Sequence, residues 1–369
     1  MDTLIFSASV GAGHDQAARA LREEILRRYP AARVAVVDTI SYISPMLNKL
    51  VLEGYLGLLK LSPRVYGKLY EKTEGGDNGA DLAHWPYRLL SGALTKVIRS
   101  YAPDAIICTH AFATGLLGTL KTRQRIRQYL TTVVTDFTVH SYWVHAGNDL
   151  YCIAHDELSG LMDDLGVPRS QVVATGIPIL SKFEKKLDKK AMRERHGLAD
   201  LPTILVMGGS LGLGKIKTIV ESLDAQAGSW QILVVTGRNE KLHDELKHRH
   251  WSNRVHVYGF INFVHELMAA ADIVLTKPGG ITAAEALSQG KPIVIMSPIP
   301  GQEDRNSRFL TEQGCAIRLR ADTQVGQKVA QLLADEEGLA ALGQRAAQLA
   351  RPFAAAAIVD QVEARVRNY

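Results

Sequence analysis

Residues 273–296 read IVLTKPGGITAAEALSQGKPIVIM and contain one complete strand–turn–helix–strand unit. Its two apolar runs, Ile273–Thr276 and Ile293–Met296, have the length and composition of buried parallel strands. Gly279 and Gly280 follow the first run and allow the tight turn that leads into an alanine-rich helix. A unit of this kind predicts a parallel sheet with helices on its faces.

The same alternation extends along the chain on both sides of this unit. The strands expected in the first half are Leu4–Ser7, Arg33–Val37, Ala105–Cys108, Thr131–Thr135, Leu150–Ile153 and Gln171–Ala174. Those expected in the second half are Thr203–Met207, Gln231–Val235, Val255–Tyr258 and the two runs above. Each half opens with a strand, a glycine-rich turn and a helix. This pattern predicts an α/β protein with two Rossmann-like domains and a ligand cleft facing the carboxyl ends of both sheets.

A charged segment marks the boundary between the halves. Ser181–His196 carries seven Lys and Arg against three Asp and Glu and has no strand character, which is typical of a solvated helix near a linker. We therefore expect an N-terminal domain at residues 1–178, a linker at 179–200 and a C-terminal domain at 201–351. A final helix, at about residues 352–369, is expected to pack back on the N-terminal domain.

The composition is that of a soluble, mildly basic protein. Apolar residues make up 46% and charged residues 22% of the chain, and the net charge is +5, which suits phosphates or a lipid surface better than nucleic acid. No run approaches the ~20 apolar residues of a spanning helix, and no signal peptide precedes the first strand, so we expect a cytoplasmic protein with peripheral membrane contact. Three scattered cysteines and the absence of an Asp-x-Asp triplet predict no metal and no cofactor.

Two glycine-rich turns follow strands. In Ser7–His14, the glycines allow close approach of a ligand, and His14 at the helix start is a candidate general base, although a loop histidine is more often merely exposed. In Met207–Lys215, four glycines expose amides that suit a diphosphate, with a purely structural loop as the alternative. This second turn is not a Walker loop, because Ile216 stands where Ser or Thr would hold magnesium.

The most specific pattern spans Gly259–Glu303. It contains Gly259-Phe260-Ile261-Asn262, then Lys277-Pro278-Gly279-Gly280-Ile281-Thr282 with Glu285, and finally Pro300-Gly301-Gln302-Glu303. We expect Thr282 to cap a helix and Glu285 to lie in its first turn. There Glu285 either complements the helix dipole or accepts hydrogen bonds from two ribose hydroxyls.

These motifs occur together in this order, and by them the chain resembles the monogalactosyldiacylglycerol synthase and processive diacylglycerol glucosyltransferase family. That family is related to the peptidoglycan N-acetylglucosaminyltransferase that makes lipid II. The resemblance covers nearly the whole chain. It implies a GT-B fold, with the acceptor in the N-terminal domain and the UDP-sugar in the C-terminal one. It also implies an inverting hexosyltransferase of EC 2.4.1 type.

The resemblance assigns roles to individual residues. His14 matches the family's proposed base, and Asp136 would orient His14 or the acceptor hydroxyl, with a turn cap as the alternative. Phe260 and Ile261 would flank the uracil and Glu285 would hold the ribose. Gly209, Ser210, Gly280 and Ile281 would bind the diphosphate, and Gln302 and Glu303 would face the hexose. Gly13 is a further donor-binding residue.

The acceptor side matches more loosely. Tyr142 and Trp143 either line an acceptor groove or belong to the core, and Ser141 stands where the family usually has proline. Residues 41–75, with Leu50 and Tyr55, predict an amphipathic helix that packs on the domain or meets lipid. A basic cluster suits anionic phospholipid or is a solvated helix face; its members are Lys121, Arg123, Arg125 and Arg127.

We therefore expect transfer of glucose or galactose from a UDP-sugar to diacylglycerol, or to a glycosyl-diacylglycerol, at a membrane surface. One alternative keeps the transfer but uses another apolar acceptor, such as a polyprenyl-linked one. Another is a UDP-N-acetylglucosamine 2-epimerase, whose equivalent turn usually reads Ser-Gly-Gly-x-Gln-Glu-Glu, unlike Lys277–Glu285. A third is a catalytically idle sugar-nucleotide sensor.

Overall fold

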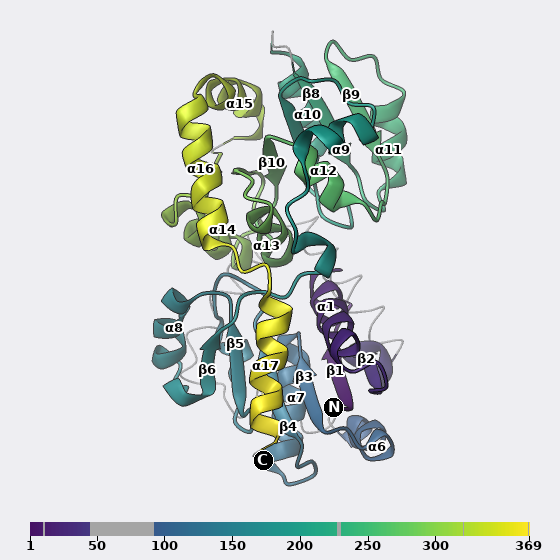
Figure 1. The fold of residues 1–369 in the computed structure, drawn as a ribbon, viewed down its shortest axis with the longest axis vertical. Coiled ribbons are helices and arrows are strands. Elements are labelled where there is room, and N and C mark those ends of the chain that lie inside the picture. The colour runs from purple at the N-terminus through teal and green to yellow at the C-terminus, as the bar shows by residue number, and fades with distance from the viewer. Residues whose placement is uncertain (10–11, 45–91, 227–229, 320, 368) are drawn as a thin grey trace. The chain divides into compact units, whose positions relative to one another are not determined.

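The computed structural model describes residues 1–369 except 10–11, 45–91, 227–229, 320 and 368 (Figure 1). The chain divides into two compact units. The first unit contains Met1–Ser181, Ile299–Gln302 and Phe353–Tyr369, and the second contains Lys182–Pro298 and Glu303–Pro352.

The first unit is built on a six-stranded parallel sheet in the order β2-β1-β3-β4-β5-β6. Its strands are β1 Thr3–Ser7, β2 Val34–Asp38, β3 Ala105–Cys108, β4 Tyr129–Val133, β5 Leu150–Ile153 and β6 Val172–Ala174. Its helices are α1 Ala12–Arg28, α2 Thr39–Ile43, α6 Gly92–Tyr101, α7 Ala111–Thr122, α8 Ser159–Asp164 and α17 Ala354–Val366. Short 3-10 turns lie at Ser141–Trp143, Asp156–Leu158 and Arg169–Gln171.

Successive residues of β1 point to opposite faces of this sheet, so each face has its own core. Ile5 packs in the core that α1 and α17 cover, whereas Leu4 and Phe6 pack in the core that α6 and α7 cover. The last helix, α17, lies beside α1 (Figure 1), and Arg28 of α1 donates to the carbonyl of Ala356 at 3.0 Å. The end of the chain thereby completes the first unit.

The second unit has a six-stranded parallel sheet in the order β12-β11-β10-β7-β8-β9. Its strands are β7 Thr203–Met207, β8 Gln231–Val235, β9 Arg254–Tyr258, β10 Ile273–Thr276, β11 Ile293–Ile295 and β12 Ala316–Arg318. Its helices are α9 Lys189–Arg195, α10 Ile216–Asp224, α11 Glu240–Lys247, α12 Val264–Ala270, α13 Gly280–Ser288, α14 Gln302–Glu312, α15 Val325–Ala334 and α16 Glu336–Leu349. Ser181–Phe183 and Asp322–Gln324 form 3-10 turns.

The expected strands all form, with ends within two residues of those predicted, and one strand among the described residues was missed. β12 is only three residues long and lies at an edge of its sheet, and Arg318 at its end is exposed. A run this short has too few apolar residues to be recognised in the sequence.

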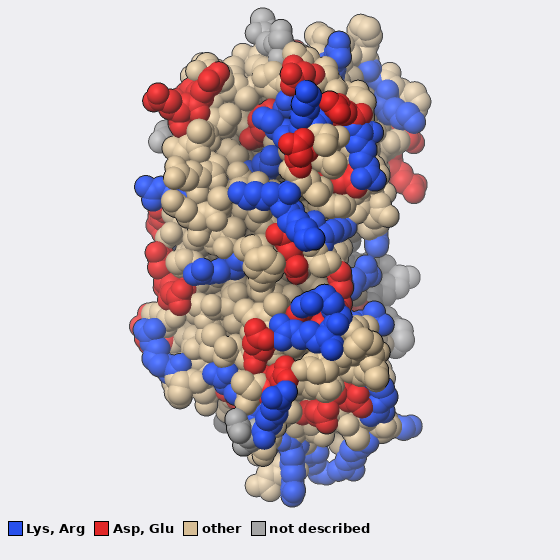
Figure 2. Space-filling view, viewed as in Figure 1, with Lys and Arg blue, Asp and Glu red and all other residues tan. Residues whose placement is uncertain are grey.

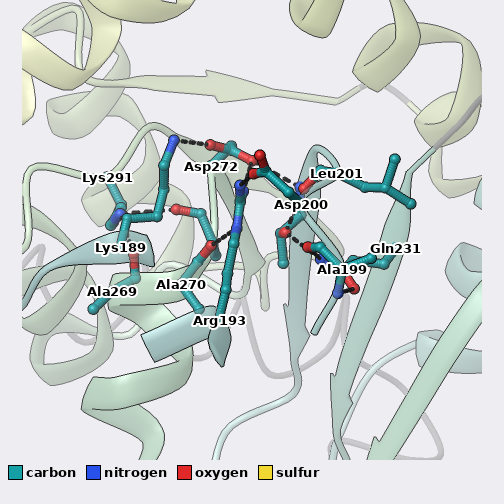
Figure 3. A network of polar contacts seen from close by, with 12 residues as sticks. Lys189, Arg193, Ala199, Asp200, Leu201, Gln231, Ala269, Ala270, Asp272 and Lys291 are labelled. Atoms are coloured by element: carbon teal, nitrogen blue, oxygen red, sulfur yellow. Dashed lines mark hydrogen bonds and ion pairs between the residues drawn. The ribbon is translucent and has the colours of Figure 1, made fainter. Parts of the chain in front are cut away.

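The basic segment Ser181–His196 makes hydrogen bonds and ion pairs with residues of the second unit. Most of α9 is exposed, as expected, but Arg193 is buried against α12 (Figure 3). Its guanidinium lies 2.7 Å from the carboxylate of Asp272 and donates to the carbonyl of Ala270 at 3.2 Å. Asp272 also accepts from the backbone amide of Thr203 at 2.7 Å and from Lys189 at 2.9 Å. These contacts tie α9 to the starts of β7 and β10.

A cleft of about 830 Å³ opens beside this network at the amino ends of the strands. Lys291 lines the cleft, and its ammonium donates to the carbonyls of Ala269 and Ala271 at 2.9 and 2.8 Å (Figure 3). Burial lowers the pKa of Lys291 to about 8. Because these carbonyls end α12, the lysine caps that helix, and the polar groups here have a structural role.

We predict that Arg193→Met lowers the free energy of unfolding by about 2–4 kcal/mol, because it leaves Asp272 and a helix carbonyl without their shared donor. Denaturant unfolding followed by circular dichroism measures this. The exposed Lys190, on the same helix, supplies the control: Lys190→Met should change stability by less than about 0.5 kcal/mol. Equal effects of the two substitutions would contradict the structural role of Arg193.

Candidate functional site

The turn between β1 and α1 is held by an acidic residue that the sequence prediction overlooked. The hydroxyls of Ser7 and Ser9 donate to the carboxylate of Asp15 at 2.8 and 2.9 Å. Asp15 lies in the first turn of α1, where a negative charge complements the helix dipole. Gly13 and His14 precede it in the same turn, so the candidate base stands at the carboxyl edge of the first sheet.

The ring of His14 has a defined tautomer. Its Nδ1 lies 2.8 Å from the carbonyl oxygen of Thr109 and 3.0 Å from the hydroxyl oxygen of Thr135. A carbonyl oxygen can only accept, so Nδ1 carries the proton and Nε2 has the lone pair. Thr109 in turn donates its hydroxyl to the backbone carbonyl of His14 at 3.1 Å. Neutral His14 can therefore take up a proton at Nε2.

The surroundings of His14 favour this neutral form. Burial lowers the pKa of His14, and the carboxylate of Asp136 opposes that shift. The ring of His110 meets His14 edge-on, with centroids 4.5 Å apart, and Trp143 lies 6.2 Å away. Burial, and then the neighbouring His14, lower the pKa of His110 well below its usual value. The Nδ1 of His110 accepts from the amide of Phe112 at the start of α7, at 3.1 Å, which also requires a neutral ring.

Asp136 is buried beside this cluster and acts on His14 through its charge. The two hydrogen bonds described above orient the His14 ring, and both come from threonines. The side-chain amide of Gln302, in the Ile299–Gln302 segment of the first unit, donates to the Asp136 carboxylate. Gln302, which the resemblance places at the hexose, thus contacts the residue that it places beside the base.

The candidate acceptor residues separate into distinct places. Trp143 is buried beside His14, whereas Tyr142 is exposed. Arg123 and Arg127 follow the carboxyl end of α7 and precede β4, so they lie at the opposite edge of the sheet from His14. Leu50 and Tyr55 fall among residues 45–91, outside the described residues, as does most of the expected amphipathic helix at 41–75.

In the second unit, the turn after β10 differs from the prediction. Gly279 is the N-cap of α13, with an extended backbone, and the helix begins at Gly280. The prediction that Thr282 caps the helix is wrong, because Thr282 lies inside it. Glu285 consequently falls in the second turn of α13 and not in the first. Glycine is an acceptable N-cap, and its position frees the amides of Gly280 and Ile281 at the helix start.

The glycine loop before α10 has both structural and open positions. Gly212 has φ +58°, and a Cβ there would lie 2.0 Å from the carbonyl oxygen of Thr236, so only glycine fits. Gly209 also has positive φ, +71°, but nothing lies within 4 Å of where its Cβ would be. Ser210 is half-buried next to it. The structural interpretation of the loop therefore holds for Gly212, and the space at Gly209 suits a ligand.

Other predicted donor residues gather at the carboxyl edge of the second sheet. Phe260 and Ile261 follow β9 after Gly259. Phe260 is 60% exposed, with the guanidinium of Arg238 5.2 Å from its ring centre. An exposed aromatic ring at a strand end suits stacking against a planar base. Glu303 lies in the first turn of α14, and its carboxylate is 2.8 Å from the ammonium of Lys277.

Known proteins resemble the chain over almost its full length. Residues 14–179 match the protein family described as Monogalactosyldiacylglycerol (MGDG) synthase. Residues 203–359 match the family described as Glycosyltransferase family 28 C-terminal domain. The chain is 31% identical over 363 residues to the processive diacylglycerol beta-glucosyltransferase of Bacillus mycoides, with 97% of this chain and 92% of that protein covered. A Bacillus cereus protein of the same name gives the same values.

The chain belongs to the monogalactosyldiacylglycerol synthase and processive diacylglycerol glucosyltransferase family. Solved structures of glycosyltransferases confirm the predicted GT-B fold class. MurG from Acinetobacter baumannii has a TM-score of 0.64 at 16% identity, with 98% of both chains covered. HepE from Anabaena, solved with UDP-glucose, has a TM-score of 0.60 at 16% identity, with 100% of both chains covered.

Several residues around the candidate site were not predicted from the sequence. Thr109 directly follows β3, Thr135 lies two residues after the end of β4, and Asp15 follows the predicted base. Polar residues after parallel strands are the signal that could have found the two threonines. Asn306, fully buried in α14, donates to the carbonyl of Pro278 at 3.0 Å, and nothing in the sequence pattern links these two positions.

Glu285, predicted from the sequence to hold the ribose, carries a carboxyl group that is costly to bury in its ionised form. Burial raises the pKa of Glu285 to about 8, and the ammonium of Lys182 opposes the shift. The folded protein therefore binds a proton here that the unfolded chain releases above the usual pKa of about 4.5. Stability associated with Glu285 is present at low pH and is lost as pH rises toward 8.

We predict that Glu285→Gln raises the free energy of unfolding by about 2–4 kcal/mol at pH 8 and has little effect at pH 4.5, because glutamine never ionises. Denaturant unfolding at both pH values measures the difference. The exposed Glu312 of α14 provides a comparison, since Glu312→Gln should give a small change at both pH values. A pH-independent effect of Glu285→Gln would point to packing and contradict the charge argument.

Proposed function

We propose that the protein transfers a hexose, with inversion, from a UDP-sugar to the hydroxyl of diacylglycerol or a glycosyl-diacylglycerol at a membrane surface. The family supports the reaction class, and two relatives are named for processive glucosyl transfer to diacylglycerol. The observation that carries the mechanism is the contact between His14 Nδ1 and the Thr109 carbonyl, because it leaves Nε2 as a base.

In the proposed reaction, the acceptor oxygen forms a bond to the anomeric carbon while the bond from that carbon to UDP breaks. The acceptor's proton passes to Nε2 of His14, and the negative charge of Asp136 stabilises the imidazolium that results. The electron pair of the broken bond leaves with the diphosphate. The amides of Gly280 and Ile281 at the start of α13 are suited to stabilise that charge.

The donor is proposed to be UDP-glucose or UDP-galactose. HepE was solved in complex with UDP-glucose, and the edge residues Phe260, Glu285 and Glu303 of this chain offer groups for a base, a ribose and a sugar. No cofactor is proposed, and the lack of an Asp-x-Asp triplet in the sequence favours transfer without a metal. Family membership favours transfer over the epimerase and sensor alternatives, and a polyprenyl-linked acceptor is the remaining rival.

The membrane contact is proposed to use a basic groove in the first unit. About 800 Å³ in volume, the groove is lined by basic side chains of α6 and of the loop after α7: Lys96, Arg99, Arg123 and Arg125. Figure 2 shows that Lys and Arg side chains gather at this end of the unit. The cluster is not a helix face, since α7 ends at Thr122, and Lys121 is paired with Asp149.

The groove is suited to attachment rather than to acceptor binding, because it lies at the opposite edge of the sheet from His14. Helices α6 and α7 cover one face of that sheet, so a membrane lying on this face would extend to both edges. In the described part of the chain, no helix combines the length and apolar character needed to cross a bilayer. We therefore propose peripheral attachment at the cytoplasmic face.

The central test offers UDP-glucose and UDP-galactose together to vesicles that contain diacylglycerol, and identifies the lipid product by mass spectrometry. We expect one hexose to be transferred preferentially.

His14→Ala should lower kcat by about 10²–10⁴ while UDP still binds, because only the base is lost. In the wild type, the acid limb of kcat/KM should lie below pH 6.5, since burial lowers the pKa of His14. Normal turnover by His14→Ala would exclude His14 as the base. Product formed only on a polyprenyl lipid would exclude diacylglycerol as the acceptor.

A separate test concerns attachment. Arg123→Ala combined with Arg125→Ala should weaken binding to anionic vesicles by about 25-fold at low salt, since each basic residue near the surface contributes about 1 kcal/mol. The control removes two charges from the second unit, by Lys190→Ala with Lys247→Ala. Sedimentation with vesicles measures both. An equal loss in the control would show a general charge effect and not a specific surface.

A further inference from the structure

An ion pair joins two of the family's motifs inside the second unit. Lys277 opens the turn after β10, and Glu303 lies in the first turn of α14. Their ammonium and carboxylate are 2.8 Å apart, and the side chains are only 12% and 16% exposed. A pair so far removed from water is screened less than a surface pair, so the two groups hold each other's positions.

The backbone around this pair is fixed as well. The fully buried Asn306 of α14 donates to the carbonyl of Pro278, so α14 and the turn are joined at two points. The side chain of Lys277 also lies 3.9 Å from where a Cβ on Gly214 would be, at the end of the glycine loop. The side chain of Lys277 therefore lies close both to the end of the glycine loop and to Glu303.

We propose that Lys277 is a positioning residue, which orients the carboxylate of Glu303 to accept hydrogen bonds from the hexose of the donor. The inference rests on the proposed function. An ionised carboxylate has about four acceptor sites, so Glu303 can accept from Lys277 and from a sugar hydroxyl together. Fixing a long side chain before binding removes an entropic cost that would otherwise oppose recognition of the sugar.

The rival role for Lys277 is direct contact with the diphosphate, which a lysine near a glycine loop could make. The two roles differ in what they predict for UDP, which has the base, the ribose and the diphosphate but lacks the hexose. A positioning role through Glu303 affects only donors that carry the sugar. A diphosphate contact affects UDP and UDP-hexose alike.

The experiment measures dissociation constants of UDP and of UDP-glucose or UDP-galactose, whichever the wild type uses, by calorimetry. Lys277→Met should weaken UDP-hexose binding about tenfold and UDP binding less than about twofold, as expected for loss of a charged hydrogen-bond partner. Glu303→Gln should show the same selectivity. The double variant should bind UDP-hexose only slightly more weakly than either single variant, because each substitution disrupts the same Lys277–Glu303 pair. Lys277→Arg, which keeps the charge, should recover most of the hexose affinity.

Two outcomes would overturn the proposal. UDP could lose as much affinity as UDP-hexose in Lys277→Met, which would indicate a diphosphate contact or a collapsed turn. Alternatively, UDP-hexose affinity could stay unchanged. Thermal melting of each variant separates collapse from contact. Wild-type protein that binds neither nucleotide would instead contradict the proposed function, so the two failures are distinguishable.

Discussion

The parallel pairing of β1 with β3 is the constraint on which the candidate base depends. Phe6 lies opposite Cys108 in this register, so both strands end at the same edge of the sheet. Thr109, the next residue, donates its amide to the carbonyl of Phe6 at 2.9 Å and accepts at its own carbonyl from His14 at 2.8 Å. A backbone carbonyl cannot ionise. The tautomer of His14 is therefore set by sheet pairing and does not depend on the charge of a neighbouring carboxylate.

Burial acts on His14 and Glu285 in opposite directions. With a lowered pKa, folded His14 binds fewer protons than the unfolded chain just below pH 6.5, so its contribution to stability rises with pH there. With a raised pKa, folded Glu285 binds more protons between about 4.5 and 8, so its contribution falls with pH. For a base, a neutral ring at physiological pH is useful. For Glu285, burial is a cost, and if this carboxyl binds the ribose as proposed, hydroxyl donors of the bound nucleotide would reduce it.

The fold was more predictable than the candidate site, because buried parallel strands leave a direct trace in the sequence. Runs such as Ile273–Thr276 are apolar on both faces, and glycines mark the turns that follow. The start of α13 was not predictable in this way, since it depends on the extended backbone of Gly279 and not on the usual N-cap preference for threonine. His14 belongs to a contiguous motif, but Thr109 and Thr135 reach it from positions 95 and 121 residues away. Only the strand order brings these positions together, and no pattern within one segment encodes it.

The candidate residues of the two units are held in place by different kinds of interaction. In the first, the neutral imidazole of His14 is hydrogen-bonded by two uncharged threonine groups, while the buried carboxylate of Asp136 acts on it through its charge. In the second, the pair of Lys277 and Glu303 keeps two charges largely out of water, which is favourable only while both partners remain. Such a pair adds little net stability, but each side chain fixes the position of the other. On the proposal above, this pair beside the turn at Gly279 contributes by orienting Glu303 toward the donor and not by adding net stability.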